Sequence, residues 1–121
     1  MFLPSVIAAS PTRDTGSFIA NSLHIQTGKS SNGYIENPDW TLRTGTGVRT
    51  YRVAVEFDSP FSMVPKVSLA LSGMDVDGVN GNRLSLTAEN ITVNGFDIVY
   101  ITWYDTIVYG AYATWIAIGG V

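Results

Sequence analysis

The clearest signal along the chain is an alternation of apolar and polar positions that begins near residue 50. Every second residue of one stretch is apolar: Tyr51, Val53, Val55 and Phe57. This period of two is typical of a half-buried β-strand, and Pro60 ends it. Further strands are predicted over 65–71, 83–90, 96–105 and 112–119, whereas no stretch repeats its apolar residues at helical spacing for three turns. The pattern therefore predicts an all-β chain.

Turn signals separate the predicted strands. An earlier strand is predicted from Phe18 through Gln26, and residues 28–47 are interpreted as turn-rich because glycines, Asn-Gly and Asn-Pro cluster there. Residues 73–82 are predicted to be a connecting loop, and Asn94-Gly95 a hairpin turn. Short strands with frequent turns favour an antiparallel β-sandwich.

Residues 1–17 differ from the rest of the chain. They hold two prolines and show no alternation, so they are interpreted as an N-terminal arm or linker before a domain of residues 18–121. Their apolar start lacks a positively charged region and is broken by Pro4, so a classical secretion leader is not expected. The protein is then expected in the cytoplasm, secreted by another route, or on a virion.

Two of the predicted strands are apolar on both faces. In 96–104 one face carries Phe96, Ile98 and Tyr100, and the other carries Val99, Ile101 and Trp103. In 112–118 one face carries two isoleucines and the other alanines and a tryptophan. A sandwich strand needs only one apolar face, so a further surface is expected to cover the second one. We interpret that surface as another copy of the chain.

The hairpin over 83–105 fixes which side chains face each other. With its turn centred on Val93, Leu84 meets Thr102, Leu86 meets Tyr100 and Ala88 meets Ile98. The same register puts Arg83 opposite Trp103 at the end of the ladder. A guanidinium beside an indole suits a hydroxylated ligand, because the arginine donates to vicinal hydroxyls and the ring stacks on a sugar. The plain alternative is a cation–π pair, or an Arg83 salt bridge to Asp77 or Asp105.

Composition and charge narrow the classes of function. Val, Ile and Thr make up 34 of the 121 residues, which supports the all-β prediction. Only 14% of residues are charged and the net charge is −3, which argues against a nucleic-acid binder or a polybasic membrane surface. Cysteine is absent and no run of 18 apolar residues occurs, which excludes disulfides, thiolate chemistry and a transmembrane helix.

Other candidate chemistry is weak. His24 is the single histidine and does not build a zinc site without Cys or a second His. Residues 75–82 alternate oxygen ligands like a calcium loop but lack the closing glutamate, so a polar loop is the better interpretation. Glu89 and Asp97 are neighbours near the hairpin turn, but far from Trp103 and with no sign of a pocket. We expect no catalytic residue, no cofactor and no metal.

Several motifs, in their order and spacing, resemble the H-type lectin family, of the snail agglutinin and discoidin C-terminal type. The most specific segments are Phe57-Asp-Ser-Pro-Phe61, Leu71-Ser-Gly-Met-Asp-Val-Asp77, Asn82-Arg83, Thr102-Trp-Tyr-Asp-Thr106 and Trp115-Ile-Ala-Ile118. The resemblance covers about residues 23–119. It implies a six-stranded antiparallel β-sandwich that assembles as a homotrimer.

The resemblance also implies a function and a site. H-type lectins bind terminal galactose or N-acetylgalactosamine glycans, for adhesion or recognition, at sites shared between subunits. The family's arginine falls on Arg83 and its stacking tryptophan on Trp103, and further site positions fall on Tyr104 and Tyr109.

One position departs from the family. An aspartate that accepts hydrogen bonds from the sugar falls on Thr46 by ungapped alignment, in a loop where Thr44 and Thr46 would shape the rim. A hydroxyl is a weaker acceptor than a carboxylate, so weak affinity or a different glycan is expected. A slipped alignment would bring Asp39 to that place instead.

A second hypothesis comes from a different class of function. The same trimer would serve as a structural or host-adhesion part of a larger assembly, such as a phage tail fibre or head spike. The apolar arm of residues 1–17 would attach it there.

Overall fold

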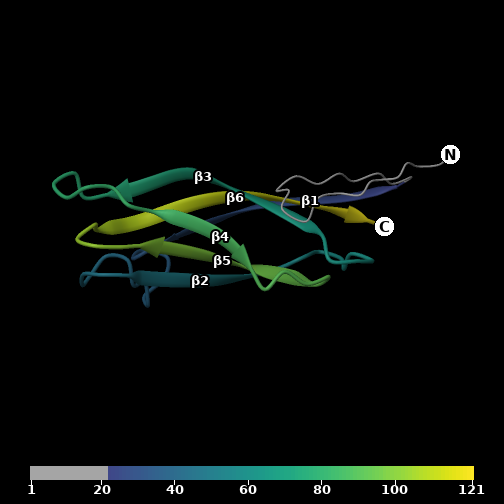
Figure 1. The fold of residues 1–121 in the computed structure, drawn as a ribbon, viewed down its shortest axis with the longest axis horizontal. Helices are drawn as coiled ribbons and strands as arrows, with labels where there is room; N and C mark the ends of the chain where they lie inside the picture. Colours follow the sequence, from purple (N-terminus) through teal and green to yellow (C-terminus); the bar gives the residue numbers. More distant parts are fainter. Residues whose placement is uncertain (1–21) are drawn as a thin grey trace, which may run out of the picture.

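A computed structural model describes residues 22–121, and these residues form six β-strands (Figure 1). The strands are β1 (Leu23–Gly33), β2 (Arg49–Glu56), β3 (Lys66–Val76), β4 (Ser85–Glu89), β5 (Gly95–Thr102) and β6 (Val108–Gly120). The predicted arm of residues 1–17 and the predicted strand start at Phe18 lie outside the described residues. The all-β prediction is confirmed.

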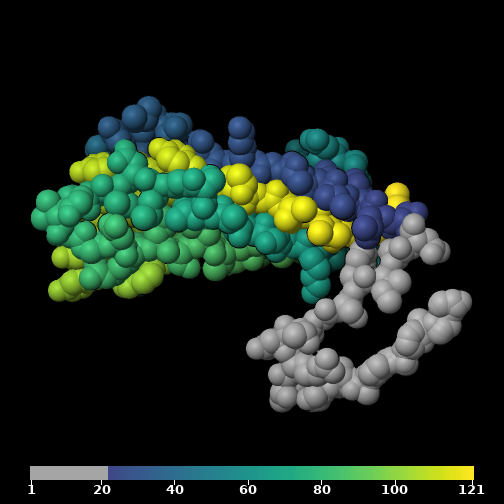
Figure 2. Space-filling model, turned by 90° about the horizontal axis from the view of Figure 1, so that it is seen from above, coloured from purple at the N-terminus to yellow at the C-terminus, as the bar shows by residue number. Residues whose placement is uncertain are grey.

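The strands form two antiparallel sheets of three strands each, in the orders β1-β6-β3 and β2-β5-β4. The two sheets stack face to face, with their strands running along the long axis of the molecule (Figure 1). β6 is the central strand of the first sheet, and β5 is the central strand of the second. Figure 2 shows β1 and β6 side by side along the length of one face. The predicted six-stranded antiparallel sandwich is therefore confirmed.

The core combines large side chains on β5 with small ones on β6. Phe96, Ile98 and Tyr100 of β5 are at most 3% exposed. Facing them, β6 contributes three buried alanines: Ala111, Ala113 and Ala117. Stacked sheets are about 10 Å apart, so a large residue on one sheet needs a small one on the other. This complementarity identifies the inner face of each central strand.

Trp115 is the exception on β6, and Gly28 of β1 makes room for it. Its indole packs between Phe57 and Phe96, at ring centroid distances of 5.8 and 5.3 Å. A Cβ atom added to Gly28 would lie 2.6 Å from the indole ring. The glycine therefore belongs to a strand that must pass close to an aromatic ring, and the turn-rich interpretation of residues 28–33 was wrong.

The far end of β1 is joined to the other sheet by a buried hydrogen bond. Asn32 is 4% exposed, and its Nδ2 donates to the Tyr100 hydroxyl at 3.0 Å. Burial raises the pKa of that hydroxyl above its ordinary value. The Asn32-Gly33 pair, which looks like a turn in the sequence, thus ends a strand and links the two sheets.

Two further expectations about strand ends need correction. Strand β3 continues to Val76, with register shifts between Leu71 and Gly73 and between Asp75 and Val76, so the loop predicted over 73–82 begins later. Strand β5 stops at Thr102, so the predicted strand over 96–105 is too long. The hairpin register itself is confirmed, because Leu86 pairs with Tyr100 and Ala88 with Ile98.

The apolar outer face of β5 is covered partly by the chain itself. Val99 is only 2% exposed in the single chain. Arg52 lies directly opposite it and extends along β5 to form ion pairs with Asp97 and Glu89. The burial of Val99 therefore needs no second subunit, contrary to the sequence argument. Within residues 22–121 there is also no apolar helix of membrane-spanning length.

The close contact between Gly28 and Trp115 gives a first prediction. We expect Gly28→Ala to lower the free energy of unfolding by about 1–3 kcal/mol, since the methyl group overpacks the core. Gly78→Ala is the matched control, because a Cβ there meets nothing within 4 Å. Urea denaturation followed by tryptophan fluorescence measures both. Equal stability of the two variants would contradict the role given to Gly28.

Candidate functional site

Three segments distant in sequence meet at one end of the sandwich, on the left in Figure 1. They are the 42–48 loop before β2, residues 81–83 before β4, and the 103–106 turn after β5. Backbone and side-chain hydrogen bonds join the three segments. This end holds most of the residues that the sequence singled out.

Arg83 is fixed by two side chains of the 103–106 turn. One terminal nitrogen, Nη1, donates to Asp105 Oδ1 at 3.1 Å and to Thr106 Oγ1 at 2.9 Å. Thr106 is fully buried and donates in turn to the Gly81 carbonyl at 2.6 Å. The salt bridge to Asp105, which the sequence left open as the plain alternative, is therefore present.

The aromatic ring beneath Arg83 is Tyr104 rather than Trp103. The guanidinium carbon lies 4.8 Å from the centroid of the Tyr104 ring. The ladder between β4 and β5 ends at Ser85 and Ile101, so Trp103 follows the strand and does not pair across it. Both rings are open to solvent, with Trp103 41% and Tyr104 64% exposed. This end of the molecule thus presents a guanidinium and two exposed rings.

The backbone around Tyr104 is strained. Tyr104 has a φ of 59°, in the left-handed region that non-glycine residues rarely adopt. Its carbonyl accepts the Gly47 amide at 2.9 Å, which attaches the loop carrying Thr44 and Thr46 to the turn. Strain at an exposed residue is held by its surroundings and often marks a functional site. The loop with Thr44 and Thr46 is therefore held beside Tyr104 at this end of the sandwich.

Tyr109 and Asp39 have other partners. The Tyr109 ring packs edge-on against Tyr34 at 6.0 Å, and Arg43 lies 4.4 Å over the Tyr34 ring. The Asp39 carboxylate accepts the Tyr51 hydroxyl at 2.8 Å. Burial and this hydrogen bond raise the pKa of Tyr51. The structure therefore joins Arg83, Tyr104 and the 44–47 loop, whereas Tyr109 belongs to a neighbouring aromatic cluster.

Sequence reasoning missed two residues that build this end of the sandwich. Thr106 is fully buried and bonds both Arg83 and the 81–83 segment, a role that only the folded turn reveals. Arg49 sits at the start of β2, and its guanidinium contacts the 42–47 loop and the 103–106 turn. Thr106 ends the Thr102–Thr106 motif, but the motif assigns it no role, and Arg49 lies in none of the motifs named above. Their partners are backbone atoms or residues distant in sequence, which no local pattern reveals.

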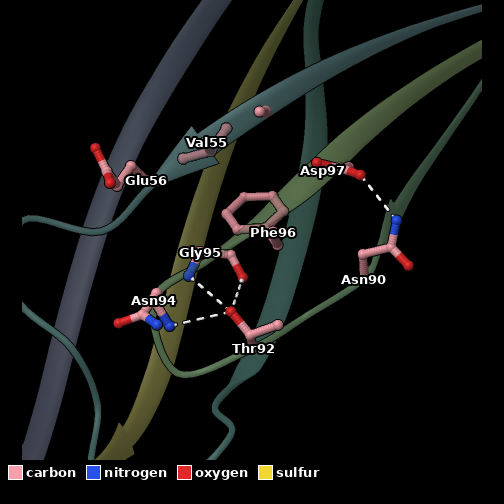
Figure 3. A pocket seen from close by; sticks show the side chains of 9 residues that line it. Val55, Glu56, Asn90, Thr92, Asn94, Gly95, Phe96 and Asp97 are labelled. Atoms are coloured by element: carbon pink, nitrogen blue, oxygen red, sulfur yellow. Dashed lines mark hydrogen bonds between the residues drawn. The ribbon is translucent and has the colours of Figure 1, made fainter.

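An open hollow of about 490 Å³ lies at the Gly95 end of β5, opposite to the end that leads to Tyr104. Figure 3 shows the side chains that line it. Its lining comes from β2, β5 and the turn between β4 and β5: Ala54, Val55, Glu56, Asn90, Thr92, Asn94, Gly95, Phe96 and Asp97. This open hollow therefore lies beside Asp97, and Glu89 is not part of its lining. With a rise of about 3.3 Å per residue, the eight residues of β5 put this hollow roughly 25 Å from Tyr104.

The carboxylates near the hollow are already engaged. Arg52 forms ion pairs with Glu89 at 2.9 Å and with Asp97 at 3.2 Å. Figure 3 shows that Asn90 also donates a hydrogen bond to Asp97, at 2.9 Å. The bonds to Glu89 and then Asp97 raise the pKa of Arg52, so the arginine stays charged. Because Arg52 forms ion pairs with both acids, they differ from the free carboxylates of a glycosidase.

Metal ligands do not gather in the described residues. Within residues 22–121 no three His, Cys, Asp or Glu side chains are grouped to hold a metal ion. His24 packs 4.4 Å from the Phe61 ring, with Nε2 3.3 Å from Ser59 Oγ. Asp77 accepts the amide of Val79 at 2.8 Å and so shapes its own loop.

Comparison with known proteins agrees with this architecture. The profile of the H-type lectin domain matches residues 52–118, from β2 to β6. The chain is 46% identical over 78 residues to the ATP synthase subunits region ORF 7 product of Fuscovulum blasticum, covering 64% of this chain and 68% of that protein. It is 37% identical over 87 residues to discoidin-2 of Dictyostelium discoideum, covering 71% of this chain and 34% of the discoidin.

A solved structure gives the same picture in three dimensions. Recombinant discoidin II of Dictyostelium discoideum superposes with a TM-score of 0.73 at 34% sequence identity, over 84% of this chain and 38% of that chain. This chain therefore spans less than two fifths of the discoidins it matches. The matched profile includes Arg83 and the 103–106 turn. The chain is a lectin-like, carbohydrate-binding domain and belongs to the H-type lectin family.

Proposed function

We propose that the end of the sandwich around Arg83 binds a terminal sugar of the galactose type. The observation that carries the proposal is the fixed guanidinium of Arg83, with the Asp105 carboxylate on one side and the exposed Tyr104 ring beside it. Trp103, the preceding residue in the turn, is exposed as well. Charged donors and acceptors recognise vicinal hydroxyls, and aromatic rings stack on the C–H face of a sugar. No bond in the ligand needs to break, and the function is binding.

Each residue has a distinct part in this proposal. Arg83 keeps its other terminal nitrogen, Nη2, for sugar hydroxyls, since its contacts to Asp105 and Thr106 are both made through Nη1. Trp103 and Tyr104 offer the stacking surfaces, and Thr44 and Thr46 form the rim. Galactose suits such rings because its axial 4-hydroxyl leaves one face of the pyranose covered by C–H groups.

Asp105 supplies the charged acceptor that Thr46 lacks. Its side chain is 45% exposed, and one of its oxygens already pairs with Arg83 at 3.1 Å. The second oxygen is the strong acceptor that a sugar hydroxyl needs. The carboxylate therefore enters the site from the turn and not from the loop before β2.

The proposed unit is a homotrimer, in which shallow sites gain avidity from their number. The outer face of β1-β6-β3 supports this part of the proposal. Leu23 and Ile25 of β1 are about half exposed there, next to Ile116 and Ile118 of β6 in the ladder. The opposite sheet carries the ion pairs of Arg52 on its outer face, so the first sheet is the better place for contact between copies.

Binding is tested on a glycan array with the full chain. We expect selective binding to galactose- or N-acetylgalactosamine-terminated glycans, reduced at least about tenfold by Arg83→Ala, since a hydrogen bond to a charged group contributes about 1.5–3 kcal/mol. Trp103→Ala and Asp105→Asn should also weaken it. Arg52→Ala is the matched control, because it removes an ion-paired arginine from the middle of β2, outside the proposed site. Unchanged binding by a folded Arg83→Ala variant would place the site elsewhere.

The oligomeric state is tested by light scattering after size-exclusion chromatography. We expect three times the chain mass of 13.1 kDa for the wild type and a smaller species for Ile25→Glu, which puts a charge on the apolar face. Ile35→Glu is the control, because Ile35 is 77% exposed in a loop. A monomeric wild type would refute the trimer, and a trimeric Ile25→Glu variant would move the interface to another face.

A further inference from the structure

Arg49 makes an unusual set of contacts at the same end of the sandwich. Its Nε donates to the Gly47 carbonyl at 3.0 Å, and Nη1 donates to the carbonyls of Thr44 at 3.2 Å and Thr106 at 2.9 Å. Its Nη2 donates to the Tyr104 carbonyl at 2.9 Å. A longer bond of 3.5 Å reaches Leu42. One guanidinium thus bonds backbone carbonyls of two separate segments.

These partners are neutral carbonyl groups, whereas Arg52 and Arg83 bond to carboxylates. The ion pairs among residues 22–121 belong to Arg52 and Arg83. A guanidinium presents five N–H donors in a rigid, planar fork, so several acceptors around it are fixed relative to one another. Arg49 therefore acts here as a geometric clamp between the 42–47 loop and the 103–106 turn.

The clamp acts on the strained residue of the turn. Tyr104 has a φ of 59°, a strained conformation for a non-glycine residue. Its carbonyl accepts two bonds, from Arg49 Nη2 and from the Gly47 amide, each at 2.9 Å. Gly47 itself has a φ of 78°, which brings its amide to that carbonyl. The conformation of Tyr104 is thus held from the loop side.

The clamp also reaches Arg83 through one shared residue. The Thr106 carbonyl accepts from Arg49 at 2.9 Å, and the Thr106 hydroxyl accepts from Arg83 at 2.9 Å. Thr106 is fully buried, so it has little freedom to move independently of either arginine. The position of Arg83 and that of the Tyr104 ring below it are therefore both linked to Arg49.

We propose that Arg49 is the positioning residue of the carbohydrate site, which sets the Tyr104 ring and the 44–47 rim without touching the sugar. This inference rests on the proposed function. Arg49 is only partly buried at the start of β2, and its donors are directed to carbonyls and not to open solvent. Its removal should loosen the site while leaving the core of the sandwich intact.

The test compares Arg49→Lys with wild type, Arg83→Ala and the control Arg52→Lys. Lysine keeps the charge but is a single point donor that cannot bridge both segments. We expect Arg49→Lys to bind immobilised galactose- and N-acetylgalactosamine-terminated glycans at least about tenfold more weakly. Its thermal unfolding midpoint should stay close to that of wild type, and Arg52→Lys should bind as wild type does. If Arg49→Lys does not fold, Arg49→Gln takes its place.

Hydrogen exchange of the Gly47 amide separates positioning from direct contact. This amide bonds the Tyr104 carbonyl, so we expect faster exchange in Arg49→Lys and unchanged exchange in Arg83→Ala, although both bind less glycan. Wild-type affinity, unchanged Gly47 exchange, or a loss of binding that only follows global unfolding would each overturn the inference. A wild-type protein that binds none of these glycans would overturn the proposed function, and this inference with it. Binding that Arg83→Ala abolishes but Arg49→Lys retains would overturn this inference alone.

Discussion

The sandwich depends on a match of sizes between its two central strands. Strand β5 presents Phe96, Ile98 and Tyr100 to the interior, whereas β6 presents alanines at the corresponding level. Sheets that are about 10 Å apart cannot hold large residues on both sides at every layer. Where β6 does carry a large residue, Trp115, the neighbouring strand β1 has a glycine, Gly28, which leaves space for the indole. The position of β1, and of the loop that follows it, derives from this match.

The same constraint explains why the candidate site lies at an end and not on a face. Interior positions of β5 are filled, and the outer face of its sheet is covered by the ion pairs of Arg52. Backbone groups beyond Thr102 have no strand partner, so they must find other donors. Arg49 and Gly47 provide these donors, and the turn that results brings Tyr104 beneath Arg83. The site is thus a consequence of how the ladder ends.

Much of the fold could be predicted from the sequence, because a strict alternation of apolar and polar residues defines both a strand and the face that it buries. The register of the β4–β5 hairpin was predicted pair by pair, as Leu86 with Tyr100 shows. The failures lie where a tertiary contact reverses a local preference. Gly28 and the Asn32-Gly33 pair resemble turn signals, yet both lie in β1. Gly28 leaves space for the indole of Trp115, and Asn32 donates a hydrogen bond to the buried hydroxyl of Tyr100 in the other sheet. Local propensity carries no information about such partners.

For the candidate site, the sequence was enough to predict which residue types take part, but not how they are arranged. Arg83 was identified, whereas its ring partner was misassigned by one residue, because the left-handed backbone at Tyr104 breaks the register that the strand rule extends.

Arg49 bonds only to backbone carbonyls, which every amino acid supplies, so its contacts do not depend on the identity of the side chains around it. Arg49 escaped notice in the sequence for this reason, because its partners are carbonyls as distant as Thr106, 57 residues along the chain. The clamp that it makes does not depend on which side chains stand at positions 44, 46 and 104. Those positions are exposed, so their side chains are free to differ among related domains while the loops keep their places. In the proposed site, a threonine in place of a carboxylate at position 46 would therefore change what the rim offers to a sugar and would leave the frame of the loops intact.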